Sequence, residues 1–207
     1  MNRWTIPGNL SDQSIAETVK LYHGGFGWVI HPVERPAKGG KKPLTKGWKK
    51  LESSFLTEEL AKEYFHCDPP YNIGCVIRPP HVVIDLDSKQ DEGSSVLEWL
   101  NSRPELVAIP RERTGGGVHI HVRCDDLPVF KKAGGKPYEK ALVATLNNQV
   151  TAELYFDGLN LVLSPSNHKN GHIYRWEVFG DIPTVTWLEL QEWFGFKEPA
   201  GCKDRKS

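Results

Sequence analysis

Carboxylate side chains stand inside one of the apolar runs of this sequence. The segment HVVIDLD carries Asp85 and Asp87 one residue apart. Successive residues of a β-strand point to opposite faces of a sheet, so both carboxylates are expected on one face, with Ile84 and Leu86 on the other. Two negative charges beside an apolar core need a cation to compensate them.

Two other segments repeat this alternation. GVHIHVR places His119 and His121 on one face of a strand. In TAELYF, Glu153 likewise lies on the face opposite the apolar residues. If the three strands are neighbours, three carboxylates and two imidazoles can converge on one open surface. Closely spaced carboxylate oxygens suit Mg²⁺ or Mn²⁺ better than zinc. Two such ions can clamp both ends of a phosphoryl transfer.

Two polar segments lie near these strands in the sequence. TGGG, from Thr114 to Gly117, precedes His119, and SPSNHKNGHIYRW covers residues 164–176. The second segment is typical of a polar turn between strands. Its hydroxyl and imidazole groups could equally hold a phosphate or a sugar beside a metal site. Each motif alone is common on a solvated surface, and only their combination indicates a functional site.

The segment from Arg35 to Lys50 contains seven basic residues and no acidic one. It could be a solvated loop or a contact for a nucleic-acid backbone. Trp48 within it could stack on a base or anchor the loop. The lysines expected to contact nucleic acid are Lys38, Lys41, Lys46, Lys49 and Lys50.

The composition limits the class of protein. The 207 residues suit one large domain or two closely packed modules, and 26 basic residues balance 26 acidic ones. The four cysteines form no Cys-x-x-Cys pair, so we expect neither a zinc site nor a disulfide framework. No apolar run is long enough to span a bilayer, and no signal segment follows Met1, which predicts a cytoplasmic protein.

Strand and helix patterns interleave along the chain, which predicts an α+β fold with a sheet covered by helices. Helices are expected after Ser14, after Thr57, over SSVLEWLNS and after Thr186. Strands are expected at FGWVIHPV, IGCVI, HVVIDLD, VAIPRER, GVHIHVR, TAELYF, NLVLS and HIYRWEV. Residues 124–140 are expected to form a surface excursion.

These pieces, in this order and spacing, resemble the N-terminal bifunctional DNA primase/polymerase (prim-pol) domain of the archaeo-eukaryotic primase superfamily. The version that they resemble occurs in replication proteins of plasmids, phages and other mobile elements. The resemblance implies an RRM-like catalytic sheet joined to a smaller N-terminal α/β module. We therefore expect a prim-pol domain over residues 1–200, with modules over about 1–70 and 71–195. Residues 201–207 are expected to be a flexible tail, consistent with further domains beyond it.

The resemblance also implies roles for single residues. Asp85 and Asp87 match the family's first metal-binding motif, Glu153 its third acidic ligand, and His119 the histidine that contacts nucleotide phosphates. Glu153 stands where many relatives carry aspartate, so its reach is one methylene longer, and Ser164 replaces a proline. The nucleotide pocket is further expected to include Thr114, Gly116, Ser166, His168 and Lys42.

The implied activity is template-directed nucleotidyl transfer, as a DNA primase, a DNA polymerase or both. The expected cofactors are two Mg²⁺ or Mn²⁺ ions, with no zinc. The expected partners are a single-stranded DNA template, a primer, ribo- or deoxynucleoside triphosphates and a helicase domain or protein, with no membrane.

Two other functions remain open. The HIH segment fits the His-hydrophobic-His pattern of rolling-circle replication nucleases, which need a tyrosine nucleophile on a nearby helix. Tyr138 in the excursion and Tyr174 in an expected strand do not meet that need, and such a nuclease has no use for the paired aspartates. The second alternative is a non-catalytic module that binds single-stranded nucleic acid. A P-loop NTPase is excluded, because no Gly-x-x-x-x-Gly-Lys-Ser/Thr motif occurs.

Overall fold

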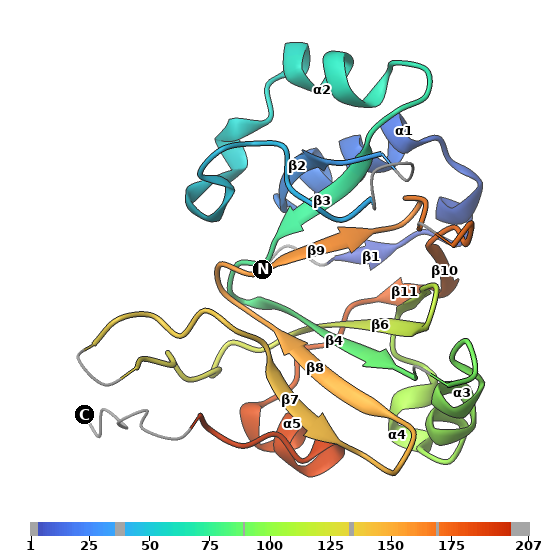
Figure 1. The fold of residues 1–207 in the computed structure, drawn as a ribbon, viewed down its shortest axis with the longest axis vertical. Coiled ribbons are helices and arrows are strands. Elements are labelled where there is room, and N and C mark those ends of the chain that lie inside the picture. The colour runs from blue at the N-terminus through green and yellow to red at the C-terminus, as the bar shows by residue number, and fades with distance from the viewer. Residues whose placement is uncertain (1–3, 36–39, 89, 133–134, 169, 200–207) are drawn as a thin grey trace.

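The fold is known from a computed structural model, which describes residues 4–35, 40–88, 90–132, 135–168 and 170–199. Two antiparallel sheets lie against each other and helices cover their outer faces, so the chain has four layers (Figure 1). The prediction of an α+β fold is confirmed. None of the helices in these described ranges is long and apolar enough to cross a membrane.

The larger sheet has six strands in the order β10-β5-β6-β4-β8-β7, and every neighbouring pair is antiparallel. Its strands are β4 (His81–Asp87), β5 (Arg111–Arg113), β6 (Gly117–Arg123), β7 (Leu142–Thr145), β8 (Thr151–Tyr155) and β10 (Arg175–Val178). The two strands at its centre, β4 and β6, have the bounds that the alternating sequence pattern predicts.

The smaller sheet consists of β2 (Val29–Val33), β3 (Asn72–Val76) and β9 (Asn160–Leu163), in that order. The module boundary expected near residue 70 falls between β2 and β3, which pair with each other. The division into two modules at that point stays a prediction. A two-stranded pairing of β1 (Thr5–Ile6) with β11 (Gly180–Asp181) joins the two ends of the described chain.

Helix starts follow the capping signals of the sequence. Ser14 and Thr186 each form a capping box with a glutamate three residues later, and the Thr57 side chain accepts the Leu60 N–H. The α-helices are α1 (Ile15–Lys20), α2 (Glu58–Phe65), α3 (Ser94–Asn101), α4 (Pro104–Val107) and α5 (Trp187–Phe194). Shorter turns are the 3₁₀ segments Leu10–Asp12, Trp48–Lys50 and Ser53–Phe55 and the π-helical segment Leu21–Gly25.

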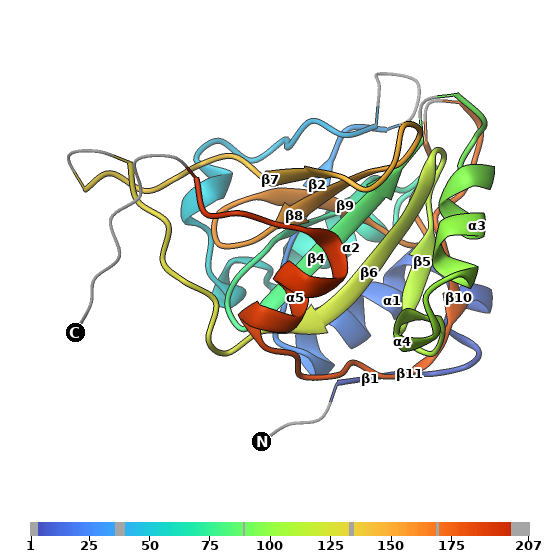
Figure 2. The same cartoon turned by 90° about the horizontal axis from the view of Figure 1, so that it is seen from below.

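One face of the large sheet is apolar and packs against α3, α4 and α5, which lie on the side away from the small sheet (Figures 1 and 2). Ile84 and Leu86 of β4 point into this core, as predicted, and both are fully buried. Since the strand period is two, their burial turns Asp85 and Asp87 to the opposite face, toward the small sheet.

Only part of that opposite face is open. At one end, Trp28 of the segment before β2 stacks on His81, with ring centroids 4.1 Å apart, and Trp176 lies 4.7 Å from the His121 ring. His121 is therefore fully buried and His119 is 3% exposed, although the sequence predicts an open surface at both histidines. The aromatic side chains close one end of the space between the sheets.

The structure differs from the sequence prediction in residues 104–145. Val107, expected in a strand, belongs to α4, and β7 was not predicted. The segment expected as a surface excursion contains a core residue. Phe130 is 5% exposed and packs edge-on against Phe156 and Trp187.

We expect Phe130→Ala to lower the free energy of unfolding by about 3–5 kcal/mol, because it leaves a cavity in the main core. Val129→Ala is the matched control, since Val129 is 81% exposed, and it should change the stability by less than about 0.5 kcal/mol. Urea denaturation of both variants measures the difference. Equal effects would show that residues 124–140 do not belong to the core.

Candidate active site

The central strands bring three of the predicted residues into one row. Asp85 of β4 stands directly opposite His119 of β6 on one side and opposite Glu153 of β8 on the other. Directly paired residues of antiparallel strands have Cβ atoms about 5 Å apart and share a face of the sheet. Asp87 lies two residues further along β4, on the same face. The register of the sheet therefore places Asp85, Asp87, His119 and Glu153 on one face.

A cavity of about 630 Å³ opens beside this row, on the side of Asp87. The predicted residues that line it are Asp85, Asp87, Thr114, Gly116, His119 and His168. Lys41, Ser88, Glu92, Gly115 and Tyr174 complete its lining. Its wall is mostly polar and contains carboxylates, imidazoles and a lysine, which are the groups that bind metal ions and phosphates.

The glycine segment lies tightly against the end of β4. A side chain at Gly116 would collide with a carboxylate oxygen of Asp87, and one at Gly117 would collide with the Leu86 carbonyl. The Thr114 hydroxyl accepts the Gly117 N–H at 3.0 Å, which holds the turn closed. Glycine is thus required here by the close approach of two backbone segments.

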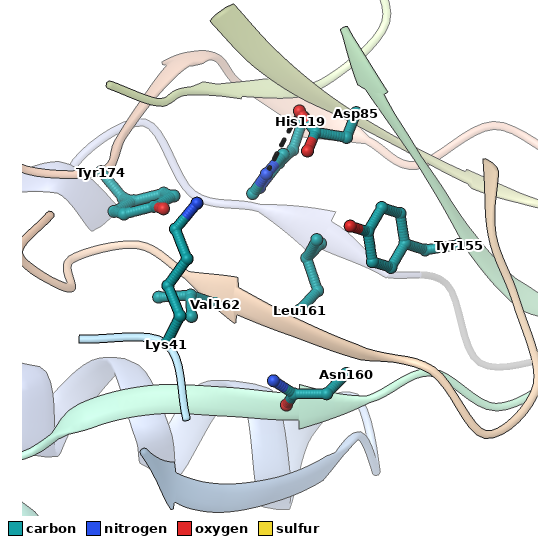
Figure 3. A pocket seen from close by; sticks show the side chains of 8 residues that line it. All are labelled: Lys41, Asp85, His119, Tyr155, Asn160, Leu161, Val162 and Tyr174. Atoms are coloured by element: carbon teal, nitrogen blue, oxygen red, sulfur yellow. Dashed lines mark ion pairs between the residues drawn. The ribbon is translucent and has the colours of Figure 1, made fainter. Parts of the chain in front are cut away.

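A second, smaller cavity of about 130 Å³ continues from the row toward β9 (Figure 3). Asp85, His119, Lys41 and Tyr174 line both cavities, so these four side chains form the boundary between them. Tyr155, Asn160, Leu161 and Val162 line the smaller cavity alone. Figure 3 shows the Lys41 side chain rising from the opposite wall, with its ammonium group toward His119 and Tyr174.

The electrostatics of the row favour a bound cation. Burial raises the pKa of Asp85, and the carboxylates of Asp87 and Glu153 raise it further, while His119 and Lys41 act in the opposite direction. The His119 Nε2 atom lies 3.7 Å from Asp85 Oδ1. The hydroxyl of Tyr155 donates to Glu153 Oε2 at 3.3 Å, and its pKa is raised by burial and by Asp85. Burial is the largest of these influences on Asp85.

Other predicted residues lie apart from the row. Ser166 is fully buried and its hydroxyl oxygen accepts the Ile73 N–H at 2.8 Å, so it fastens β3 and lines neither cavity. His168 lines the larger cavity, with Nδ1 2.5 Å from the Asn170 side-chain oxygen. Lys42 is exposed and lines neither cavity; its neighbour Lys41 enters both.

The rest of the basic segment lies on the surface. Lys46, Lys49 and Lys50 are exposed, and Lys49 forms an ion pair with Glu139 at 3.4 Å. The Trp48 ring lies 6.2 Å from the His31 ring and nearly parallel to it, which agrees with an anchoring role. Lys38 lies outside the described residues.

Glu112 of β5 was not selected from the sequence, yet it joins both histidines of the HIH segment. Its Oε1 lies 2.8 Å from His119 Nδ1 and 3.3 Å from His121 Nε2. Ligand atoms of these three residues lie within 4.8 Å of one another, which is close enough for a metal ion. Asp85, Asp87 and Glu153 share a face but, within the described chain, do not form so tight a group.

A signal for Glu112 exists in the sequence but needs the strand order. In RERTGGGVHIH, an antiparallel hairpin around the glycines pairs Glu112 with His119 and puts both on one face. Lys41 and Tyr174 carry no comparable signal, because they enter the cavities from a loop and from the segment before β10. Their place depends on how the two sheets pack.

Comparison with known proteins identifies the family of the chain. The family model described as "Bifunctional DNA primase/polymerase, N-terminal" matches residues 20–188, which include every residue of the row and both cavities. The chain belongs to this Prim-Pol family. Membership implies a metal-dependent enzyme of the nucleotidyltransferase kind, with DNA and nucleotides as substrates. No curated protein matches the chain.

The buried histidines behind the row predict a pH-dependent stability. Burial and the neighbouring His121 lower the pKa of His81 well below its ordinary value, and burial also lowers the pKa of His121. Below about pH 6.5 the unfolded chain therefore binds more protons at these rings than the folded chain does. The contribution of His81 and His121 to the free energy of unfolding should fall as the pH decreases from 7 to 5, by up to about 1.4 kcal/mol per pH unit for each ring, while His119, whose pKa is raised, contributes in the opposite direction.

His81→Phe keeps the stacking on Trp28 and removes one of these rings, so its stability should fall less steeply over the same pH range. His66→Gln, at an exposed position, is the control and should keep the original slope. Urea denaturation at pH 7, 6 and 5 gives the slopes. If His81→Phe and the unmodified protein have equal slopes, His81 is not held neutral in the fold.

Proposed function

We propose that this chain catalyses template-directed nucleotidyl transfer, as a DNA primase, a DNA polymerase or both, by a two-metal mechanism. The observation that carries the proposal is the register of β4 between β6 and β8, with Asp85 between His119 and Glu153. Family membership supports the class of reaction, and the larger cavity has room for a nucleotide beside the carboxylates.

The residues present fit Mg²⁺ or Mn²⁺. Asp85, Asp87 and Glu153 offer only oxygen atoms, which both ions prefer. Burial raises the pKa of Asp85, and a bound cation would favour its ionised form. We infer that these three residues hold the two ions. When bound, the ions would activate the attacking 3′-hydroxyl and stabilise the triphosphate and the leaving pyrophosphate.

The chain's own residues supply orientation. His119 and Lys41 stand at the boundary of the two cavities and can contact phosphate oxygens from opposite walls. Thr114 and Gly116 shape the wall next to Asp87, and His168 lies at the same cavity. Ser166 would act through the position of β3, and Lys42 would contact the substrate only from outside the cavities.

The template would run along the exposed lysines of the basic segment, Lys46, Lys49 and Lys50, with Lys38 as a further candidate. Contacts of this kind weaken steeply with salt. We propose a primer, a single-stranded DNA template and a helicase domain or protein as partners. The proposed setting is the replication of a plasmid, phage or other mobile element in the cytoplasm.

One observation favours a rolling-circle nuclease as a second candidate. Glu112, His119 and His121 could hold one metal ion, and Tyr174 lines both cavities next to His119. Against it, His121 is fully buried away from the cavities, and burial and the Asp85 charge raise the pKa of Tyr174, which opposes formation of a phenolate nucleophile. A covalent tyrosine–DNA product would establish this candidate.

We expect the double variant Asp85→Ala, Asp87→Ala to reduce labelled-nucleotide incorporation to background, because it removes two of the three oxygen ligands. The assay uses primed and unprimed single-stranded DNA with Mg²⁺ or Mn²⁺. Mn²⁺ should also raise the melting temperature of the unmodified protein, since the ion binds the folded state and relieves the repulsion between carboxylates, and this rise should be absent in the double variant.

Glu192→Ala, on α5 behind the large sheet, is the matched carboxylate control and should retain full incorporation. Circular dichroism checks that the double variant keeps its fold. Undiminished synthesis by the folded double variant would contradict the proposal. Nucleic-acid binding without synthesis by the unmodified protein would favour a non-catalytic binding module.

A further inference from the structure

Glu112 is a fully buried carboxylate in the core between the two sheets. A buried charge of this kind is stable only when donors surround it. Glu112 has three of them: His119 Nδ1 at 2.8 Å, His121 Nε2 at 3.3 Å and the Ser164 N–H at 2.6 Å. Burial alone would raise the pKa of Glu112, but the hydrogen bonds from His119 and His121 outweigh it and lower the pKa to about 2. The carboxylate is therefore an anion throughout the neutral range.

The hydrogen-bond directions follow from this charge. An ionised carboxylate only accepts, so both imidazoles must donate to it. His121, whose pKa is lowered by burial, is neutral and donates Nε2–H, which leaves its Nδ1 atom bare. That atom lies 3.1 Å from His81 Nε2, which supplies the matching N–H. His81, His121 and Glu112 thus form one chain in which every donor meets an acceptor.

His119 is the second histidine that donates to Glu112, and its ring also lines the candidate site. With Nδ1–H donated to Glu112, the opposite ring atom, Nε2, is turned toward the cavities and lies 3.7 Å from Asp85 Oδ1. The third bond of Glu112, to Ser164, links β5 of the large sheet to the turn that follows β9 of the small sheet. One side chain therefore fixes both the ring of His119 and the spacing of the two sheets beside it.

We propose that Glu112 is a positioning residue of the nucleotide site, which accepts the Nδ1–H of His119 and so keeps Nε2 turned toward the cavity proposed to hold the nucleotide. The inference rests on the proposed function for its effect on nucleotides, but the hydrogen bond itself does not. The three donors also account for the charge of Glu112 without a metal ion at the Glu112, His119 and His121 group.

Two measurements test the proposal separately. The first is long-range ¹H–¹⁵N NMR of the histidine rings in the metal-free, full chain at neutral pH, with His119 assigned by comparison with His119→Asn. His119 should carry a proton on Nδ1, and Glu112→Gln should shift its ring signals. The second is the steady-state incorporation of nucleotides. In Glu112→Gln the KM for the nucleotide should rise about 10-fold or more, with a smaller change in kcat, and Glu112→Asp should recover part of the loss.

His81→Phe is the matched control, since it removes the hydrogen bond between His81 and His121 and leaves the bond between Glu112 and His119 in place. It should lower stability and leave the His119 signals and the nucleotide KM unchanged within about twofold. If the hydrogen-bonded series from His81 to Glu112 had only a structural role, His81→Phe would change both the His119 signals and the KM. A bare Nδ1 on His119 in the unmodified protein would overturn the proposal, and this result does not depend on whether Glu112→Gln folds. Stoichiometric metal in the purified protein that is lost in Glu112→Gln would also overturn it. Absence of nucleotide incorporation with a protonated Nδ1 would contradict the proposed function and leave the positioning role in place.

Discussion

The antiparallel register at the centre of the large sheet is the constraint on which the candidate site depends. It places Asp85 between His119 and Glu153, and a slip of one residue on either side would send those partners into the apolar core. The burial of Ile84, Leu86, Val118, Ile120, Ala152 and Leu154 on the reverse face fixes this register. The packing energy that holds Asp85, His119 and Glu153 in one row therefore comes mostly from apolar residues on the reverse face.

The face that carries the carboxylates divides into a closed end and an open end. At the closed end, Trp28 and Trp176 pack on His81 and His121 and exclude water. At the open end, the glycine segment carries no side chains that would fill the space next to β4. Asp85 lines both cavities there, and Asp87 lines the larger one. Glu112 lies between these ends and connects them by hydrogen bonds. The charge of Glu112 is thus compensated by hydrogen bonds within the core, whereas Asp85 and Asp87 line a cavity at the open end.

Features of the fold and the site that depend on residues close together in the sequence could be predicted from it. The period of two in HVVIDLD and GVHIHVR is local, so the bounds of β4 and β6 and the shared face of Asp85 and Asp87 were predicted correctly. The capping boxes at Ser14 and Thr186 are equally local, and both helices start where they indicate. The order and spacing of the motifs resemble the prim-pol family, and the family match confirms this prediction.

Features that depend on tertiary packing were not predicted. Lys41 rather than Lys42 enters the cavities, because the backbone around Lys42 is fixed at the edge of β2, where the Glu34 N–H donates to the Lys42 carbonyl. The burial of His121 depends on aromatic residues from distant segments, and the role of Glu112 depends on the strand order. The burial of Phe130 has no local signal, because charged residues and glycines are frequent in the stretch around it.

The most direct test of the central claim is a crystal structure of the protein with Mn²⁺ and a non-hydrolysable nucleotide, with the ions located from their anomalous scattering. The account predicts manganese bound by oxygen atoms of Asp85, Asp87 and Glu153, and nucleotide phosphates next to His119 Nε2. Manganese held by Glu112, His119 and His121, with the three carboxylates free of metal, would contradict it.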